Sequence, residues 1–548
     1  MSGFGPDALR PSNVEDVDIE KRFATGPEFG EKEATTTTQE EPNSIAKQLH
    51  RTPTNSSQKQ HSNARLISLV VTLTGAAFLN TLSVQACVIV LPTIGEHLHI
   101  PDARQQWIVS AYSLTFGCFL LLWGRLADVY GKKAIFVLGS LWVTIMCIVI
   151  PFCPTEISFD VLRGLQGFGA AANVPTAIGI LGVTFPPGKA KNYAFSFYSA
   201  GAPMGSVFGN LLGGILAQYA SWQWIFWVLA IIAGIVTVCG YFVIPLPAKS
   251  TTPKNLAGAV DWIGGVLVTV SLIALMFAMT QGNVVGWSTP YIPVLIVISI
   301  LLLALFVVWQ LYLEKRTTRP PLMKVTIFVN TRVSAAMVTM ALFFTTFNNY
   351  LVFATYFYQE YLALDAIQTT VRFIPTGVVG CLTIFATSQL LARVKVNYIL
   401  LFSITCVSIS VLLFALPIAP STTYWAYGFP AMCLSVFGAD TLYPSLMLFT
   451  SHSLPRENQA LGGALINAVA QIARAIGLAI GTAVQVSVQA SREHLDVSLA
   501  QTSSTEGNEA YLDGLRAAEW FSFAMAVAGF FVILVFLRGT GIIGQVKK

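Results

Sequence analysis

Long apolar segments, separated by short polar stretches, recur along the chain after residue 65. An α-helix rises about 1.5 Å per residue, so a hydrocarbon core of about 30 Å needs about 20 apolar residues per crossing. Lipid offers the backbone no hydrogen-bond partners, and the alternation typical of barrel strands does not dominate, so each segment is predicted to be a helix. Fourteen spans are predicted, at about 66–94, 105–124, 134–152, 157–184, 192–218, 224–246, 261–280, 290–312, 333–357, 370–391, 397–417, 424–450, 459–489 and 518–537.

Lysine and arginine are distributed unevenly between the two sides of these spans. In membrane proteins, cytoplasmic loops contain more lysine and arginine than the loops on the other side of the membrane. Eighteen fall on the side of the even-numbered connections and the C-terminal tail, and only Arg104, Arg372, Arg492 and Arg516 fall on the other. Both termini are therefore predicted to be cytosolic. The regular alternation also supports fourteen spans over twelve.

Composition narrows the class of protein further. With 548 residues, 54% hydrophobic and 11% charged, the chain is predicted to be a polytopic membrane protein. Its net charge of +5 is scattered among short loops, which argues against nucleic-acid binding. The eight cysteines show no CxxC spacing and are expected to be buried thiols, so neither a metal site nor a cofactor is expected. Residues 1–65 are hydrophilic, which predicts a disordered cytosolic tail without a cleavable signal peptide.

The ten residues GRLADVYGKK occupy the turn between predicted spans 2 and 3. They supply Gly124, Asp128, Gly131, Lys132 and Lys133. A preference for basic residues on the cytoplasmic side explains the lysines but not the glycines or the aspartate. The segment resembles the signature loop of the major facilitator superfamily. This resemblance implies a conformational latch between the two halves of the fold, in which Asp128 interacts with a neighbouring helix end or arginine.

Further segments resemble the fourteen-span drug:proton antiporter branch in its fungal, multidrug or aminotriazole-resistance-like form. These are WQW from Trp222 and DWIGG from Asp261, while LRGLQGFGAA from Leu162 resembles a segment of the superfamily and GSVFGNLLGG from Gly205 resembles its glycine-rich antiporter motif. The resemblance implies an all-α fold of two six-helix bundles with two extra central spans. The domains expected are a tail at 1–65, a bundle at 66–246, two accessory spans at 247–332, a second bundle at 333–538 and a tail at 539–548.

Two positions depart from that family pattern. The antiporter-like motif comprises Gly205, Gly209, Gly213 and Gly214, but it has Asn210 where the family usually has proline. In span 1, Ser83 stands where the family usually has an aspartate linked to proton transfer. The glycines also have a purely structural explanation, because small residues let any two membrane helices approach closely.

Three ionisable residues lie well inside the predicted spans: Arg163, Asp440 and Arg474. Such groups cost several kcal/mol at bilayer depth, so each is a functional candidate. Asp440 is predicted to couple transport to protons, with Arg163 and Arg474 stabilising its charge or that of the substrate. A static ion pair between Asp440 and Arg474 is the alternative. The other carboxylates near the membrane, Asp160, Asp261, Glu360 and Glu519, are predicted at span ends that water reaches.

Polar residues at helical spacing indicate which faces line a cavity. Arg163, Gln166 and Asn173 share one face of span 4, and Asn467, Gln471 and Arg474 share one face of span 13. Asn348 and Asn349 lie in an aromatic stretch of span 9. The amides are predicted to line a substrate cavity: Asn173, Asn348, Asn349, Asn467 and Gln471. A structural network of interhelical hydrogen bonds is the alternative.

The combined features favour a secondary transporter, a proton-driven exporter of small organic molecules that alternates access between two bundles. A narrow-substrate carrier or uniporter for a metabolite or inorganic solute is the alternative. An enzyme is not expected, because the HExxH and GxSxG motifs are absent, and the absence of a Walker loop argues against direct use of ATP. The expected setting is a monomer in a fungal plasma membrane, with the vacuolar membrane as the alternative.

Overall fold

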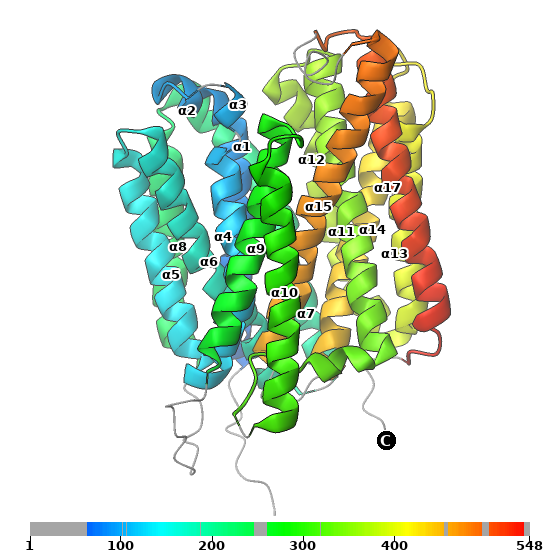
Figure 1. The fold of residues 1–548 in the computed structure, drawn as a ribbon. Coiled ribbons are helices and arrows are strands. Elements are labelled where there is room, and N and C mark those ends of the chain that lie inside the picture. The colour runs from blue at the N-terminus through cyan, green and yellow to red at the C-terminus, as the bar shows by residue number, and fades with distance from the viewer. Residues whose placement is uncertain are drawn as a thin grey trace, which may run out of the picture. The chain divides into compact units, whose positions relative to one another are not determined.

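The computed structural model describes residues 63–100, 102–105, 107–186, 188–245, 260–317, 319–453, 459–495 and 504–541. Long helices dominate these residues and run side by side (Figure 1). The predicted N-terminal tail lies outside the described residues except for its last three positions, and so do residues 542–548 of the C-terminal tail. Residues 246–259, at the start of the predicted accessory region, also lie outside them.

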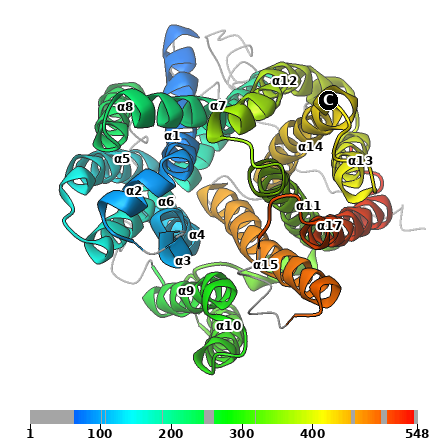
Figure 2. The same ribbon diagram turned by 90° about the horizontal axis from the view of Figure 1, so that it is seen from above.

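The first bundle contains six long helices: α1 (Asn63–Ile89), α4 (Trp107–Tyr130), α5 (Lys132–Val149), α6 (Glu156–Thr184), α7 (Lys189–Tyr219) and α8 (Gln223–Val243). The short elements α2 (Leu91–His97), α3 (Asp102–Gln105) and η1 (Ile150–Phe152) join them. Viewed from above, the helices coloured blue to cyan-green form one group (Figure 2). We call the end of the molecule at Lys132 the basic end and the other the opposite end.

The second bundle contains α11 (Thr331–Tyr356), α12 (Ala366–Arg393), α13 (Val396–Ala415), α14 (Tyr424–Ser453), α15 (Gln459–Glu493) and α17 (Glu509–Phe536), with the single π-turn η3 (Phe357–Tyr361) after α11. A separate pair, α9 (Trp262–Val285) and α10 (Tyr291–Arg316), precedes it, followed by η2 (Val325–Val329). The all-helical architecture of two six-helix bundles and two extra spans agrees with the sequence prediction, and each of the fourteen predicted spans overlaps one long helix.

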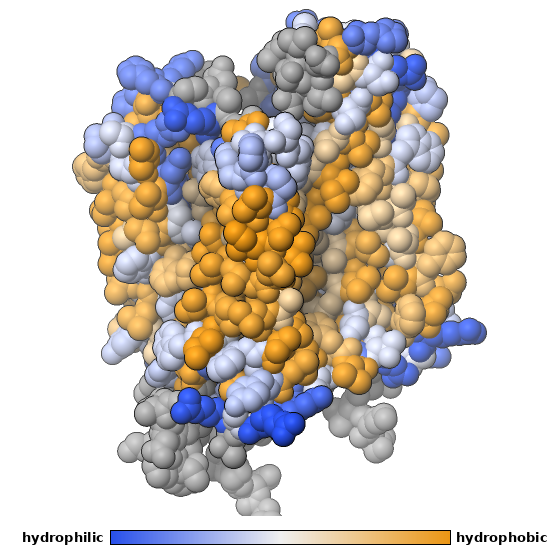
Figure 3. All heavy atoms as spheres, in the orientation of Figure 1, coloured by the Kyte–Doolittle hydropathy of each residue, from blue (hydrophilic) through white to orange (hydrophobic). Residues whose placement is uncertain are grey.

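Thirteen of the described helices are long and apolar enough to cross a membrane. The remaining predicted span, at 192–218, corresponds to α7, a helix of 31 residues that is not among those thirteen. It carries serines and glycines along its length, which suits a helix packed against α1 and facing the interior. On the face shown in Figure 3, an apolar band covers the middle of the molecule between hydrophilic ends. The chain is therefore a multi-pass membrane protein.

The accessory pair is held together by a buried carboxylate. Asp261 caps the start of α9 by accepting from the Gly264 amide at 2.9 Å. It also accepts from Trp309 Nε1 at 3.0 Å and from Gln310 Nε2 at 2.6 Å, both on α10. In the view from above, α9 lies beside α4 and α15, where the two bundles meet, and α10 packs on the outer side of α9 (Figure 2). Asp261 is at a helix end as predicted, but it is buried by its partners.

The last helix begins earlier than the sequence predicted. Asn508 accepts from the amides of Ala510 at 2.9 Å and Tyr511 at 3.3 Å, and this cap starts α17 at Glu509 instead of near 518. Glu519 therefore lies inside the helix with 2% of its surface exposed. The prediction that Glu519 sits at a water-exposed span end is wrong. The first turns of α17 are polar, so hydropathy alone did not predict that they belong to the helix.

Candidate functional site

A cavity of about 570 Å³ lies between the two bundles. Helices α1, α4, α6 and α7 line it from one side, and α11, α12, α14 and α15 line it from the other. The volume falls within the range of about 300–1,000 Å³ typical of small-molecule sites. The lining combines aromatic rings with amides and hydroxyls and includes two ionisable residues of opposite sign, Asp440 and Arg474. We call it the central cavity.

Asp440 lies at the seam where the two bundles meet, with 8% of its surface exposed. Its Oδ2 is buried and has no hydrogen-bond partner among the described residues. A Cβ added to Gly380 of α12 would stand 2.8 Å from this oxygen and 3.3 Å from Cβ of Pro203 on α7. Glycine at position 380 thus leaves the room that the carboxylate occupies. Three helices, two from one bundle and one from the other, meet at this carboxylate.

Arg474 lines the same cavity but does not pair with Asp440. No ion pair between them forms in the described part of the chain. The guanidinium instead lies 4.5 Å from the centre of the Phe344 ring and donates to Gln471 Oε1 at 3.4 Å. The static ion pair that the sequence left open is therefore absent from this conformation.

Three of the five amides predicted to line a cavity do so: Asn348, Asn467 and Gln471. Asn467 accepts from the hydroxyl of Tyr443 at 3.1 Å. Asn173 lies elsewhere, accepting from Ser140 Oγ at 3.2 Å between α5 and α6. Asn349 donates to the Gly477 carbonyl at 3.1 Å between α11 and α15. Neighbouring helix residues point about 100° apart, and here Asn348 faces the cavity while Asn349 faces α15.

Polar residues of the first bundle that the sequence did not predict also line the cavity. Gln85 on α1 donates to Ser206 on α7 at 3.2 Å, and Tyr112 donates to Asn80 Oδ1 at 2.5 Å. Asn80, Gln85 and Ser206 all belong to the lining. The spacing of Ala77, Thr81, Gln85 and Val88 was the available signal. It was overlooked because none of these residues is charged.

Arg163 is fully buried inside the first bundle and does not line the central cavity. Its Nε donates to the Ile108 carbonyl at 3.0 Å, and its Nη1 donates to Gln166 Oε1 at 2.6 Å and to Ser83 Oγ at 3.1 Å. The guanidinium also lies 4.8 Å from the centre of the Tyr112 ring. The structure thus does not bring Arg163 together with Asp440 or Arg474.

The loop predicted at residues 124–133 is largely helical, because 124–130 end α4 and Lys132 begins α5, with Gly131 between them. At the basic end it contacts the second bundle. Asp128 Oδ2 accepts from the Leu461 amide at 3.0 Å, and its Oδ1 pairs with Lys132 Nζ at 2.8 Å. Leu461 lies in the first turn of α15, where amides lack partners within the helix and favour negative charge. A Cβ at Gly124 would stand 2.6 Å from Cβ of Ala464, so glycine permits α4 to touch α15.

The other two members of the loop have local roles. Gly131 adopts a φ of 105°, a backbone conformation that favours glycine, and it precedes α5. Lys133 lies 5.3 Å from the centre of the Tyr241 ring on α8. The loop therefore turns sharply while Asp128 and Gly124 form the contacts with the second bundle.

The central cavity extends away from this contact. Its lining includes Val88 near the end of α1, Tyr356 at the end of α11, Gln359 in η3 and Thr369 at the start of α12. These residues lie toward the opposite end of the molecule. The bundles are thus joined at the basic end and separated by the cavity toward the opposite end.

Residues 73–478 match the family pattern of the Major Facilitator Superfamily. A low affinity ammonium transporter of Saccharomyces cerevisiae is 33% identical over 394 residues, which make up 71% of this chain and 75% of that protein. The chain belongs to the Major Facilitator Superfamily. The resemblance inferred from the loop at 124–133 is confirmed, and the protein is a transporter and not an enzyme.

Other relatives in the superfamily include drug-type transporters. The efflux pump terG of Aspergillus terreus is 29% identical over 482 residues, covering 86% of this chain and 87% of the pump. The aminotriazole resistance protein of Saccharomyces cerevisiae is 27% identical over 454 residues, covering 79% of this chain and 78% of that protein. The solved structure of the human organic anion transporter MFSD10 (TETRAN) superposes with a TM-score of 0.61 at 14% identity, covering 85% of this chain and 99% of that chain. This last likeness concerns the fold alone.

The glycine motif of this superfamily member packs α7 directly onto α1. A Cβ at Gly205 would clash with the Phe78 carbonyl and stand 3.0 Å from the Leu82 nitrogen, and one at Gly209 would stand 2.9 Å from Cβ of Gln85. Asn210, in place of the usual proline, lines the central cavity. Gly213 is buried, whereas a Cβ at Gly214 would meet nothing within 4 Å.

Gly205→Val is expected to destabilise the protein, because the added side chain forces α7 away from the α1 backbone. Overpacking of this kind costs about 1–3 kcal/mol. The thermal unfolding midpoint of the purified protein in detergent measures the loss. Gly214→Val adds the same volume to the same helix in open space and is expected to leave the midpoint unchanged. Equal midpoints for the two variants would contradict the packing assignment.

Ser83→Asp is expected to stabilise the protein. Arg163 Nη2 is buried with no hydrogen-bond partner among the described residues. The other terminal nitrogen of Arg163, Nη1, lies 3.1 Å from Ser83 Oγ. A carboxylate there supplies the missing countercharge, and charged hydrogen bonds contribute about 1.5–3 kcal/mol. Ser83→Asn has nearly the same shape without the charge and is the matched control. A melting midpoint no higher for Ser83→Asp than for Ser83→Asn would contradict this prediction.

Proposed function

We propose that the protein is a proton-coupled exporter of small organic molecules that alternates access to the central cavity between its two ends. The observation that carries this proposal is the position of Asp440, a lone carboxylate of that cavity at the seam of α7, α12 and α14. Burying an ionised carboxylate without a partner costs several kcal/mol, and taking up a proton removes that cost. Relative motion of the bundles changes which end supplies the proton.

The cycle we propose uses both ends of the molecule. In the conformation described, Asp128 and Gly124 hold the basic end closed, and Asp440 meets the cavity that extends toward the opposite end. A proton binds the carboxylate from that side. The bundles then rock, the contact of Asp128 with α15 breaks, and the proton leaves toward the basic end while substrate enters. Arg474 stabilises negative charge on Asp440 or on the substrate.

The proposed orientation places the basic end and both termini in the cytosol of a plasma membrane, with the protein acting as a monomer. The concentration of lysine and arginine on the even-numbered connections supports this orientation. Arg163 then has a positioning role in the first bundle, joining α6 to α4 through the Ile108 carbonyl and to α1 through Ser83.

A second candidate function is transport of ammonium or another small solute. The observation that favours it is the 33% identity to the yeast low affinity ammonium transporter, compared with 29% and 27% to the efflux pump and the aminotriazole resistance protein. The size of the central cavity favours an organic molecule instead, since about 570 Å³ greatly exceeds the space of a single ion.

Purified protein in liposomes separates these candidates. An inside-acid gradient is imposed, and uptake is followed for three permanently charged fluorescent compounds: a quaternary cation, an anion and a zwitterion. Permanent charge prevents passive trapping of weak bases in the acid lumen. Gradient-dependent uptake of any of them supports the exporter. Ammonium-evoked changes in lumenal pH beyond those of protein-free liposomes, without organic flux, support the narrow carrier.

A further inference from the structure

A second buried carboxylate lies inside the second bundle. Glu519 is the tenth residue after the start of α17, about 15 Å along the helix axis at 1.5 Å per residue. Only 2% of its surface is exposed, and both carboxylate oxygens are buried without a hydrogen-bond partner among the described residues. None of the ion pairs in that part of the chain involves it. A buried carboxylate without a hydrogen-bond partner calls for a bound ligand or a proton.

A small cavity touches this carboxylate. It measures about 20 Å³, and a cavity holds a water molecule once it exceeds about 10–15 Å³ on the same measure. The aromatic residues Phe353, Phe414 and Tyr427 form part of its wall, and Arg516 and Ile418 lie toward the opposite end of the molecule. It shares no lining residue with the central cavity. We call it the Glu519 cavity.

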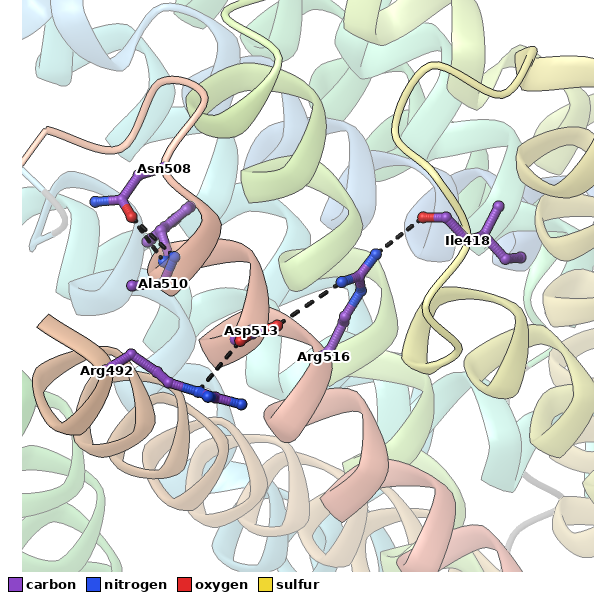
Figure 4. A network of polar contacts seen from close by, with 7 residues as sticks. Ile418, Arg492, Asn508, Ala510, Asp513 and Arg516 are labelled. Carbon is purple, nitrogen blue, oxygen red and sulfur yellow. Dashed lines mark hydrogen bonds and ion pairs between the residues drawn. The ribbon is translucent and has the colours of Figure 1, made fainter.

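Arg516 and Ile418, which line the Glu519 cavity, belong to a chain of polar contacts (Figure 4). Arg516 Nη2 donates to the Ile418 carbonyl at 2.9 Å and its Nη1 lies 3.7 Å from Asp513 Oδ1. Asp513 Oδ2 in turn lies 3.2 Å from Arg492 Nε on α15. Arg516 therefore ties α17 to the connection between α13 and α14. Because α17 begins at the opposite end, Arg516 lies between that end and Glu519 along the helix.

Other titratable or charged groups occur on the elements packed against α17. Glu360 and Tyr511 hydrogen-bond each other, and Arg492 is engaged with Asp513. The further titratable groups on those elements are Arg332, Tyr350 and Tyr356 on α11, Tyr358 and Tyr361 in η3, Tyr398 and Cys406 on α13, and Arg474 and Glu493 on α15. Tyr427 on α14 lines the cavity as well, and Arg474 lines the central cavity instead. The nearest basic group along the helix, Arg516, is held by Asp513 and Ile418, so it leaves Glu519 without a countercharge.

We propose that Glu519 is a second proton-binding carboxyl, reached by water from the opposite end through the Glu519 cavity and separate from the central cavity. The ligand is a proton and not a metal ion, because hard cations such as Ca²⁺ take about six to eight oxygen ligands. The side chains of the cavity wall offer one carboxylate and one phenol as oxygen ligands, and the others are apolar except for the cationic Arg516. No cluster of three metal-ligating acids, histidines or cysteines occurs in the described part of the chain. The second bundle thus holds two proton sites, one at the seam and one in its interior.

Difference infrared spectroscopy of the full-length protein in lipid nanodiscs, between alkaline and acidic buffer, tests this proposal. The wild type is expected to show carbonyl bands of two buried protonated carboxyls. Glu519→Gln is expected to remove one band and Asp440→Asn the other. If Glu519→Gln fails to fold, Glu519→Asp is used, which keeps the acid and shifts its band. A difference spectrum that neither Glu519 variant alters would overturn the proposal.

Exchange into D₂O tests the route. The Glu519 band is expected to shift slowly in the wild type and at least about tenfold faster in Arg516→Gln, the effect of losing one charged hydrogen bond. Arg492→Gln is the matched control, because it removes an exposed member of the same network and leaves the Arg516 contact with Ile418 in place. Equal exchange rates in Arg516→Gln and the wild type, or a Glu519 band that disappears in Asp440→Asn, would contradict a separate route.

Discussion

Asp440→Asn is expected to abolish gradient-driven transport while leaving the protein folded. Asparagine has nearly the same shape but carries no proton-exchanging group, so the seam between α7, α12 and α14 stays filled and the coupling group is lost. Accumulation of the transported compound in liposomes with an inside-acid lumen is expected to fall by about tenfold or more, within the range typical of coupling free energies. Exchange of labelled for unlabelled compound without a gradient is expected to continue.

The matched control for this variant is Asp261→Asn. Asp261 is an equally buried aspartate, with 8% of its surface exposed like Asp440, but it lies between α9 and α10 and not in the central cavity. Its replacement is expected to weaken the accessory pair and to leave the gradient dependence intact. If Asp440→Asn accumulates the compound as well as the wild type does, Asp440 is not the coupling group.

Gly124→Val is expected to open the basic end. The added side chain collides with Ala464 of α15, where a Cβ alone would already lie 2.6 Å from the Ala464 methyl group. An overpacking cost of about 1–3 kcal/mol shifts the equilibrium between the two conformations by roughly 5–150-fold. The same change moves Asp128 away from the Leu461 amide. Both effects favour the conformation in which the basic ends of α4 and α15 are apart.

Double electron–electron resonance between spin labels at positions 130 on α4 and 453 on α14 measures this shift in the conformational equilibrium. Both positions are exposed and lie at the basic end of different bundles, and the exposed Cys381 is replaced beforehand. The label-to-label distance is expected to lengthen in Gly124→Val. Gly234→Val in α8 is the control, because a Cβ there meets only Thr144, at 3.9 Å. An unchanged distance in Gly124→Val would show that the α4–α15 contact does not set the conformation.

Much of the fold was predictable because the membrane constrains it strongly. Every spanning helix must satisfy its own backbone, so length and hydropathy located all fourteen helices, although α17 began nine residues earlier than expected. The stripe formed by Asn467, Gln471 and Arg474 on α15 also proved to face the cavity, since helical spacing alone places those residues on one side. The loop at 124–133 was recognisable because its glycines and aspartate are not explained by the basic-residue rule.

The candidate site was less predictable, because it depends on which helix faces meet. Arg163 and Asp440 both looked like charges of one cavity, yet they lie in different bundles, with Arg163 enclosed by Ser83, Gln166 and Ile108. Asn348 lines the cavity while Asn349 binds the α15 backbone. A linear pattern gives the angular position of a side chain on its own helix but not the rotation of that helix against its neighbours.

By itself the sequence determined that the protein is a polytopic helical transporter of this superfamily, because apolar length, the distribution of basic residues and the loop at 124–133 are properties of local segments. Only the tertiary structure decided that Asp440 stands at the seam without Arg474, that Asp128 holds the first turn of α15, and that Glu519 is enclosed in the second bundle. Such pairings join residues far apart in the chain. Their energies come from burial and contact between helices, which no single segment encodes.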